Sequence, residues 1–417
     1  MKIRTTLVTV MLALSALAAL AQPQGVDSVN NRIMLNGDDW SMIYEQLERG
    51  NGKFTVVHIG DSHVQPGIIS DEVSKAMQQH YGNGGRGLIC PLALAGTNAP
   101  SDYVLKSSAA ISASSRLLSR NKPAGMGMTG VAVKFAGGST TLTIGTKQEG
   151  DDFDRVTVFH AAGQPFEVSQ DGSSLKGRHV SATASSFDLN GLTDSAALRL
   201  RGDGALYGIR LLNRRPGVVV DCIGNNGATF SSYLHIDGFA QQLKDLDPQL
   251  VIISLGTNEA YGNYSSLESN IDRLITSIKR ECPGAKFLLT TPLETHKKGG
   301  RGYVVQGGIA GVRDIIMRYA LKHKIAVWDF YSVAGGKGAA ARWLKVKYMS
   351  SDHLHLLNRG YHYMGSLLAQ ALLKTISTND SGEIIPASDV EETIPVKDTD
   401  EIIPVNDAVK AHPASNE

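Results

Sequence analysis

The chain has 417 residues, which is enough for two or three domains. Its 41 Lys and Arg nearly balance its 40 Asp and Glu, and the net charge of +1 provides no strong field for a nucleic-acid backbone. We therefore expect no nucleic acid among its partners. An apolar content of 42% is enough for a packed core and excludes a wholly disordered chain.

The first segment has the pattern of an export signal. Lys2 and Arg4 precede an apolar run over residues 7–20, and Ala-Leu-Ala then stands before Gln22. This pattern predicts a signal peptide over residues 1–21, and the apolar run is too short to span a bilayer comfortably. Gln22, where a lipoprotein would have Cys, argues against a lipid anchor. We expect an exported protein, periplasmic or extracellular, with no membrane span.

The cysteines provide no structural framework. Cys90, Cys222 and Cys282 are too few for a disulfide scaffold and are not spaced as zinc ligands. One bridge could form, and a Cys222–Cys282 pair stays open. The favoured interpretation is that each thiol is a small buried apolar side chain.

Two separated parts of the chain alternate between short apolar runs and helical patterns. The runs that predict strands are 54–59, 218–220, 250–255, 286–291 and 325–329. The helical patterns are 68–80, 238–246, 267–281, 308–323 and 360–374. Buried strands that alternate with helices predict a five-stranded parallel sheet in a three-layer α/β/α domain. We expect residues 22–100 and 216–376 to form this domain.

Residues 101–215 have a different pattern, with alternating strands, Gly-rich turns and no long helix. The clearest predicted strands are 131–135, 141–144, 155–159 and 197–201. An insertion of this length cannot be a simple loop. We expect an inserted β-sandwich domain with a jelly-roll-like arrangement.

The end of the chain is acidic and rich in Pro. Ile-Pro recurs every nine residues, at 385, 394 and 403, amid Asp and Glu. This composition predicts a disordered tail over residues 377–417, with a docking peptide as the alternative.

A candidate nucleophile follows the first predicted strand. Gly60-Asp61-Ser62-His63 begins where that strand ends, and ligands of open parallel sheets bind at the carboxyl ends of strands. Ser62 could therefore project into a cleft. A plain turn is the alternative, because Asp and Ser are common in turns.

The partners that a serine nucleophile needs lie near the end of the chain. A serine hydroxyl must be deprotonated by a base, and a carboxylate must orient that base. Asp352 and His355, three residues apart before the last helix, could form this pair, with His353 as a neighbour. A metal site would need more ligands at known spacing.

The inserted segment contains a second acidic cluster. A calcium site is one interpretation of Asp151, Asp152 and Asp154, but a solvated turn is favoured. We expect neither a metal nor a cofactor anywhere in the chain.

Two loops after strands can supply donors for an oxyanion. Residues 224–229 include Gly227, whose backbone N–H could face a cleft, and residues 256–259 include Asn258, whose side chain carries an NH₂ group. Ordinary Asn- and Gly-containing turns are the alternative for each loop alone.

Taken together, these four blocks resemble those of the SGNH (GDSL-like) hydrolase family, in the family's order. The resemblance implies that Ser62 is the nucleophile, His355 the base and Asp352 its orienter. It also implies an oxyanion hole formed by Ser62, Gly227 and Asn258. Two departures are His63, where the family has leucine, and Glu259, where aspartate is commoner. With Asp61 and Arg86, these residues are expected beside the substrate.

A narrower resemblance concerns the substrate. Gly-Asp-Ser-His, the loop 84–87, Asn226-Gly227-Ala228 and the inserted β domain are similar to features of secreted peptidoglycan O-acetylesterases. In that group the insert is similar to a carbohydrate-binding module. This resemblance implies hydrolysis of the acetyl ester on a muramyl sugar through an acetyl-Ser62 intermediate. Arg86 would then contact an anionic glycan, or else pair with a surface carboxylate.

Three alternatives remain open from the residues. The enzyme could deacetylate another glycan such as xylan, or transfer acetyl groups between sugars. A remote alternative is a non-catalytic glycan-binding protein that acts through its β domain.

Overall fold

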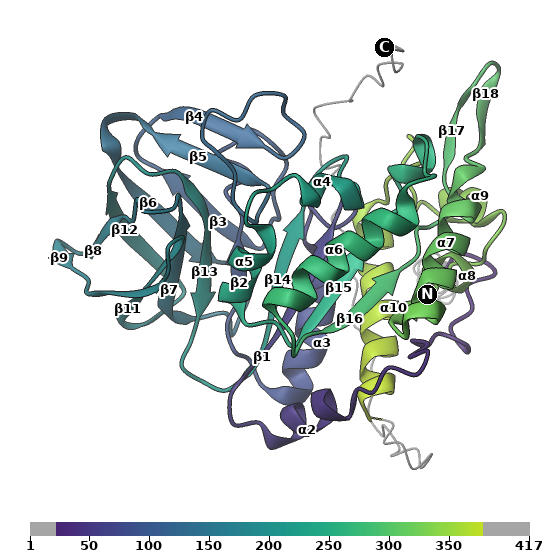
Figure 1. The fold of residues 1–417 in the computed structure, drawn as a ribbon, viewed down its shortest axis with the longest axis horizontal. Coiled ribbons are helices and arrows are strands. Elements are labelled where there is room, and N and C mark those ends of the chain that lie inside the picture. Colours follow the sequence, from purple (N-terminus) through teal and green to yellow (C-terminus); the bar gives the residue numbers. More distant parts are fainter. Residues whose placement is uncertain (1–21, 378–417) are drawn as a thin grey trace, which may run out of the picture.

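The structure, a computed structural model, describes residues 22–377 (Figure 1). The predicted signal peptide, residues 1–21, lies outside the described residues. The predicted tail does too, apart from residue 377, which ends the last helix. Within residues 22–377 no helix is both long and apolar enough to cross a bilayer.

The core of the larger domain is a five-stranded parallel sheet, as predicted. Its strands, in spatial order, are β14 (Gly217–Gly224), β1 (Lys53–Gly60), β15 (Leu250–Ser254), β16 (Lys286–Thr290) and β19 (Ala326–Trp328). The apolar runs form buried strands because helices cover both faces of the sheet. In register, Gly60 pairs with both Gly224 and Ser254, so the loops that follow β1, β14 and β15 begin side by side.

Two helical layers cover the sheet (Figure 1). Alternate β1 side chains face opposite layers, because successive strand residues point to opposite faces. Val57 and Ile59 belong to one apolar cluster, and Val56 belongs to the other. The helices that pack in the first cluster are α4 (Phe230–Leu234), α5 (Phe239–Leu243), α6 (Leu267–Glu281) and α7 (Gly308–His323). Those that pack in the second are α2 (Ser41–Arg49), α3 (Ile68–Tyr81), α8 (Phe330–Val333), α9 (Ala339–Lys345) and α10 (Asn358–Ser377).

Long amphipathic helices match their predicted ranges, and short elements do not. The ranges predicted for α6 and α7 coincide with the observed helices. The single helix predicted over 238–246 is instead α5 followed by a 3-10 turn over Lys244–Leu246. The sequence analysis did not identify α2, α8, α9 or the hairpin of β17 (His296–Gly299) and β18 (Gly302–Val305). These elements have four to nine residues, so each repeats its hydrophobic period too few times to give a clear pattern.

A β domain is inserted between α3 and β14, and it forms two antiparallel sheets (Figure 1). The first has the order β10 (Gly177–Ser181), β11 (Ala184–Thr193), β7 (Phe153–His160), β13 (Leu206–Leu212), β5 (Val131–Phe135) and β4 (Ile111–Arg116). The second has the order β3 (Tyr103–Ser107), β6 (Ser139–Thr146), β12 (Ser195–Arg201), β8 (Glu167–Gln170) and β9 (Ser173–Ser174). The predicted inserted β architecture is therefore present.

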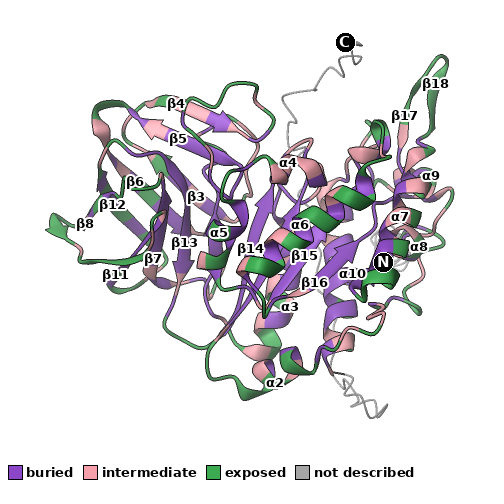
Figure 2. Ribbon diagram, in the orientation of Figure 1, coloured by how far each residue is buried: buried purple, intermediate pink, exposed green. Residues whose placement is uncertain are grey.

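The two domains share one core. Buried side chains of the β domain, such as Leu142 and Phe153, belong to the same apolar cluster as Val57 and Ile59 of the parallel sheet (Figure 2). The short strand β2 (Gly87–Ile89) precedes the predicted boundary at residue 100, yet it pairs with β13 of the β domain. The chain thus joins the β domain earlier than the sequence pattern indicated.

All three cysteines are buried and free. Burial raises the pKa of the Cys222 thiol to about 11, so this thiol is not reactive at neutral pH. The Cys222–Cys282 pair that the sequence left open does not form.

Candidate active site

Four loops meet at the carboxyl edge of the parallel sheet. Ser62 comes two residues after the end of β1, Gly227 follows β14, and Asn258 follows β15. The segment with Asp352 and His355 precedes α10. The structure therefore brings together residues that are almost 300 positions apart in sequence.

Ser62, His355 and Asp352 form a continuous hydrogen-bonded chain. The Nε2 of His355 lies 3.0 Å from Ser62 Oγ, and its Nδ1 lies 2.7 Å from Asp352 Oδ2. Since a carboxylate only accepts, we assign the imidazole proton to Nδ1, which leaves Nε2 to accept the Ser62 hydroxyl proton. This is the geometry that a nucleophile, its base and an orienting carboxylate require.

Backbone bonds hold Asp352 in place. Its Oδ1 accepts the N–H groups of Leu354 and His355, each at 3.0 Å, so a tight turn orients the carboxylate. Burial raises the pKa of Asp352, but its hydrogen bonds with His355 and the backbone outweigh burial and lower that pKa to about 2. The carboxylate is thus ionised at every pH at which an esterase of this type would work.

Two backbone donors near Ser62 are unoccupied. Within residues 22–377, the N–H groups of Ser62 and Gly227 have no hydrogen-bond partner. Gly227 has φ +75°, a left-handed conformation that favours glycine. A Cβ at Gly227 would lie 2.6 Å from Leu118 Cδ1, so only glycine fits here without displacing that side chain.

The amide of Asn258 already has two acceptors. Its Nδ2 donates to the carbonyl of Ala228 at 3.0 Å and, over a longer 3.4 Å, to Asp61 Oδ2. The first bond ties the loop after β15 to the loop after β14. The second is long enough that a better acceptor could replace it.

Two carboxylates adjoin this amide, the buried Asp61 and the partly buried Glu259. Burial raises the pKa of Asp61 to about 6 and that of Glu259 to about 7. The Oδ1 of Asp61 accepts the N–H of His63, and Oε1 of Glu259 accepts the N–H of Phe230. The Oε2 of Glu259 is buried without a partner among the described residues. Both residues therefore hold the backbone of the loops that contain His63 and Phe230.

His63 lies beside His355. Its ring centroid is 5.5 Å from that of His355, and its Nδ1 lies 3.3 Å from the hydroxyl of Tyr361. Burial, followed by the charge of His355, lowers the pKa of His63 to about 3. A neutral imidazole therefore borders the site.

Arg86 was expected beside the substrate, and the structure corrects this expectation. Its side chain is only 7% exposed and pairs with Asp102, with Nη2 2.7 Å from Oδ2. The guanidinium also donates to the carbonyl of Leu88 and lies over the ring of Tyr103. The partner carboxylate is itself mostly buried, so this pair is structural and not a surface contact. The guanidinium of Arg86 therefore has its partners inside the protein.

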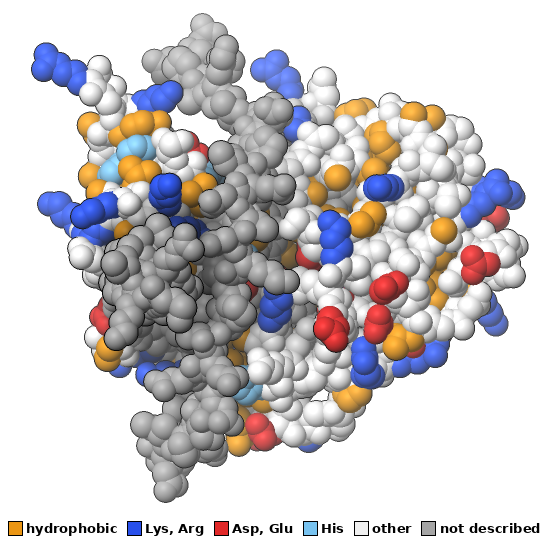
Figure 3. Space-filling model, turned by 180° about the vertical axis from the view of Figure 1, so that it is seen from behind, with side chains coloured by type: hydrophobic (Ala, Val, Ile, Leu, Met, Phe, Trp, Pro, Cys, Tyr) orange, Lys and Arg blue, Asp and Glu red, His pale blue; other side chains and the backbone are white. Residues whose placement is uncertain are grey.

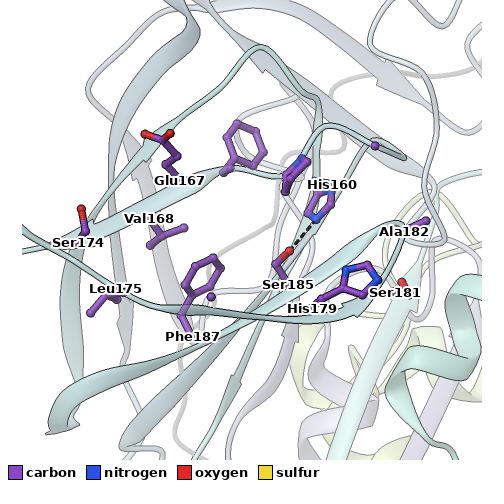
Figure 4. A pocket seen from close by; sticks show the side chains of 14 residues that line it. His160, Glu167, Val168, Ser174, Leu175, His179, Ser181, Ala182, Ser185 and Phe187 are labelled. Atoms are coloured by element: carbon purple, nitrogen blue, oxygen red, sulfur yellow. Dashed lines mark hydrogen bonds between the residues drawn. The ribbon is translucent and has the colours of Figure 1, made fainter.

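A cavity of about 690 Å³ lies in the β domain, apart from the residues described above (Figure 4). Apolar side chains such as Phe166, Val168 and Phe187 line much of it. The Nε2 of His160 points to Ser185 Oγ across 3.1 Å, as Figure 4 shows. The Nδ1 of His160 bonds the carbonyl of Ala161 across 3.0 Å, so a backbone carbonyl stands here where His355 has the carboxylate of Asp352.

Several features of the site were not identified from the sequence. Leu118 reaches Gly227 from the β domain, Tyr361 contacts His63 from α10, and the β17–β18 hairpin contacts His353. The hairpin had a readable signal, since Gly299-Gly300 and Gly302 separate two short segments. The other two contacts are between distant parts of the chain and had no local signal.

Comparisons with known proteins agree with this geometry. The family model of GDSL-like lipases and acylhydrolases matches residues 191–363, a range that includes Asn258 and His355 but not Ser62, which precedes the inserted domain. The solved structure of a peptidoglycan O-acetylesterase has a TM-score of 0.68 and 22% identity, and the alignment covers 82% of this chain and 97% of that one. No curated protein sequence matches the chain significantly.

Other solved structures match a smaller share of this chain. A GDSL-like lipase from Bacteroides thetaiotaomicron is 24% identical over 38% of this chain and 76% of its own, with a TM-score of 0.30. A lipase/acylhydrolase from Enterococcus faecalis is 22% identical over 37% of this chain and 76% of its own, also with a TM-score of 0.30.

The resemblance read from the four sequence blocks is therefore confirmed. The family model and the bonds that join Asp352, His355 and Ser62 support a carboxylic ester hydrolase similar to the GDSL-like lipases and acylhydrolases. Its fold, including the β domain between α3 and β14, is similar to that of the peptidoglycan O-acetylesterase.

Proposed function

We propose that the protein is an exported serine esterase that removes O-acetyl groups from the glycan strands of peptidoglycan. The observation that carries the chemistry is the chain of hydrogen bonds from Asp352 through His355 to Ser62. The substrate is supported by the similarity in fold, across both domains, to a peptidoglycan O-acetylesterase.

In the first half of the reaction, Ser62 Oγ attacks the acetyl carbonyl carbon while its proton passes to His355 Nε2. The carbonyl oxygen becomes an oxyanion, which the N–H groups of Ser62 and Gly227 stabilise together with the Asn258 amide. The tetrahedral intermediate then collapses. The sugar oxygen leaves with the proton from His355, and Ser62 is left acetylated.

In the second half, a water molecule gives a proton to His355 Nε2 and its oxygen attacks the acetyl carbon. Collapse of this intermediate breaks the bond to Ser62 Oγ, which takes the proton back, and acetate leaves. Asp352 accepts from Nδ1 throughout and stabilises the imidazolium in both halves. Because acetyl is small, most recognition of the polymer must come from groups around this centre.

The residues around this centre have separate roles in this proposal. His63 lies beside His355 as a neutral imidazole, and the buried Tyr361 contacts its Nδ1. Asp61 and Glu259 hold the oxyanion loops through hydrogen bonds to His63 and Phe230. Residues 22–100 and 216–376 would form the catalytic domain, and residues 101–215 would extend the substrate surface.

The test is acetate release from O-acetylated peptidoglycan, acetylated xylan and a small chromogenic acetate, with Ser62→Ala as the control. Release from peptidoglycan that depends on Ser62 supports the proposal. Release from xylan alone would mean that xylan, and not peptidoglycan, is the substrate. Activity on the chromogenic ester alone would keep the esterase and overturn the peptidoglycan assignment. Acetylated product formed from an added glycan acceptor would indicate a transferase.

A further inference from the structure

The β17–β18 hairpin is fastened to the loop that contains Asp352 and His355. The backbone N–H of His296, at the start of β17, donates to the carbonyl of His353 across 3.0 Å, and the Nδ1 atoms of the two rings are 2.9 Å apart. The ring of Tyr303 in β18 stacks on His353 at 3.7 Å between centroids. Because His353 lies between Asp352 and His355 in the chain, the base of the hairpin adjoins the catalytic loop.

The hairpin carries three cations and no acid. Lys297, Lys298 and Arg301 are all exposed, and residues 295–306 contain neither Asp nor Glu. None of the three cations forms an ion pair within residues 22–377. The preceding acid, Glu294, is buried and accepts the N–H groups of Gly338 and Ala340. In a chain whose net charge is +1, this is a local concentration of positive charge.

Apolar surface gathers at the same place. Four of the ten large apolar side chains that are exposed among the described residues belong to the hairpin or contact it: Tyr261, Tyr303, Val304 and Val305. Tyr261, which is 43% exposed, donates its hydroxyl to the carbonyl of His296 across 3.0 Å. In Figure 3 a group of hydrophobic and His side chains bordered by Lys and Arg occupies the upper left. Exposed apolar patches with a polar rim are typical of binding surfaces.

The core does not require this hairpin. Its two strands form a sheet of their own, and the hairpin projects from the body of the molecule (Figure 1). An isolated two-stranded ribbon is marginally stable in water. Its contacts with His353 and Tyr261 nevertheless fix its base at one end of the active site.

We infer that this hairpin is a substrate arm that binds the carboxylates of the peptidoglycan strand while Ser62 acts on the ester. The inference rests on the proposed function. A peptidoglycan strand carries carboxylates on its peptide stems, which complement Lys297, Lys298 and Arg301. Tyr303 pairs with Lys298 across the hairpin and stacks on His353, so exposed apolar surface adjoins both the cations and the loop that contains Asp352 and His355.

The first test compares the wild type with Lys297→Glu/Lys298→Glu/Arg301→Glu on soluble O-acetylated peptidoglycan fragments and on a chromogenic acetate. At low salt, the KM for the fragments should rise roughly tenfold, with kcat and all constants for the chromogenic acetate unchanged, because surface charges act through a screened field. Added salt should raise the wild-type KM toward that of the variant. An unchanged KM for the fragments would overturn the inference.

A matched control reverses three cations elsewhere. Arg273 and Arg280 on α6 and Arg318 on α7 are exposed, and the triple Glu variant has the same change in net charge. This variant should keep the wild-type KM for the fragments. An equal rise in KM in both variants would mean that only net charge matters, and it too would overturn the inference.

A binding assay separates this inference from the proposed function. Sedimentation of Ser62→Ala protein with peptidoglycan needs no ester, and it can be repeated after the peptidoglycan carboxylates are blocked as methylamides. If the hairpin binds carboxylates, the affinity for untreated peptidoglycan should fall about tenfold when the carboxylates are blocked. It should fall to the same extent when the three cations are reversed. Binding that ignores both changes would contradict the arm, even if acetate is released. Binding as predicted without acetate release would keep the arm and remove the proposed reaction.

Discussion

Leu118 of the β domain lies directly against Gly227 of the parallel-sheet domain. A Cβ at Gly227 would be 2.6 Å from Leu118 Cδ1, and the φ of Gly227 is +75°. The same two segments are linked by the Asn225 side chain, which donates to the carbonyl of Thr129 across 3.0 Å. The inserted domain therefore helps to shape a loop whose N–H we assign to the oxyanion hole.

This contact makes Gly227→Ala a sensitive variant. Alanine is strained at this φ, so the loop shifts and its N–H moves away from the oxyanion, and the new methyl group also meets the half-exposed Leu118 side chain. We expect kcat on the chromogenic acetate to fall about 10- to 100-fold. Adding Leu118→Ala should restore part of the loss, since it removes the clash but not the strain. A double variant no better than Gly227→Ala would show that Leu118 does not constrain the loop.

Asn258→Ala removes the one side-chain donor of the proposed oxyanion hole. The transition state should lose about 3 kcal/mol of stabilisation, which lowers kcat on the chromogenic acetate roughly 100-fold. The KM should change little, because the donor acts mainly on the charge that develops in the transition state. Thermal unfolding of the variant provides the control for loss of the bond to Ala228. A loss of activity below about fivefold would exclude Asn258 from the oxyanion hole.

Asp352→Asn keeps the size of the side chain but removes its charge. The amide can present its NH₂ group to His355 Nδ1, which favours the wrong tautomer for a base at Nε2. We expect kcat to fall roughly 10²- to 10⁴-fold with an unchanged fold by circular dichroism. Near wild-type kcat would mean that another group orients His355.

The raised pKa of Glu259 predicts how the free energy of unfolding depends on pH. Its folded-state pKa is raised by burial from 4.5 to about 7, so the folded protein binds this proton more tightly than the unfolded chain does. The contribution of Glu259 to stability is therefore fully present below pH 4.5 and is lost as the pH rises through about 7.

Glu259→Gln should relieve that loss. The amide oxygen can still accept the Phe230 N–H, and no charge is buried. The free energy of unfolding at pH 8 should rise by roughly 1 to 3 kcal/mol relative to the wild type, with little change at pH 5. Denaturant unfolding at both pH values measures this difference. A variant that is less stable at pH 8 would contradict the raised pKa.

The sequence predicted the part of the fold that depends on long, regular hydrophobic patterns. The helices at 267–281 and 308–323 were placed at their observed bounds, because fifteen or more residues display the helical period clearly. The hairpin at 296–305 was not identified, because its short, exposed strands have no buried face and thus no alternating pattern.

The surroundings of a side chain were harder to predict than the catalytic motifs. Ser62 and His355 were named from motifs, and the structure puts them within hydrogen-bond distance. Arg86 was expected near the substrate, but its environment depends on Asp102 and Tyr103 at the entrance to the β domain. Such tertiary contacts have no trace in local composition. The same holds for Leu118, which reaches Gly227 from more than 100 residues away.

The most direct test of the account is to trap the acyl-enzyme. The protein is mixed with a chromogenic acetate, quenched in acid within the first turnovers, and digested for peptide mass analysis. The account predicts one added acetyl group on the peptide that contains Ser62, and none after Ser62→Ala. Turnover of the ester with the acetyl group on another residue would contradict the account. So would the absence of an acetyl-enzyme in the wild type together with full activity in Ser62→Ala.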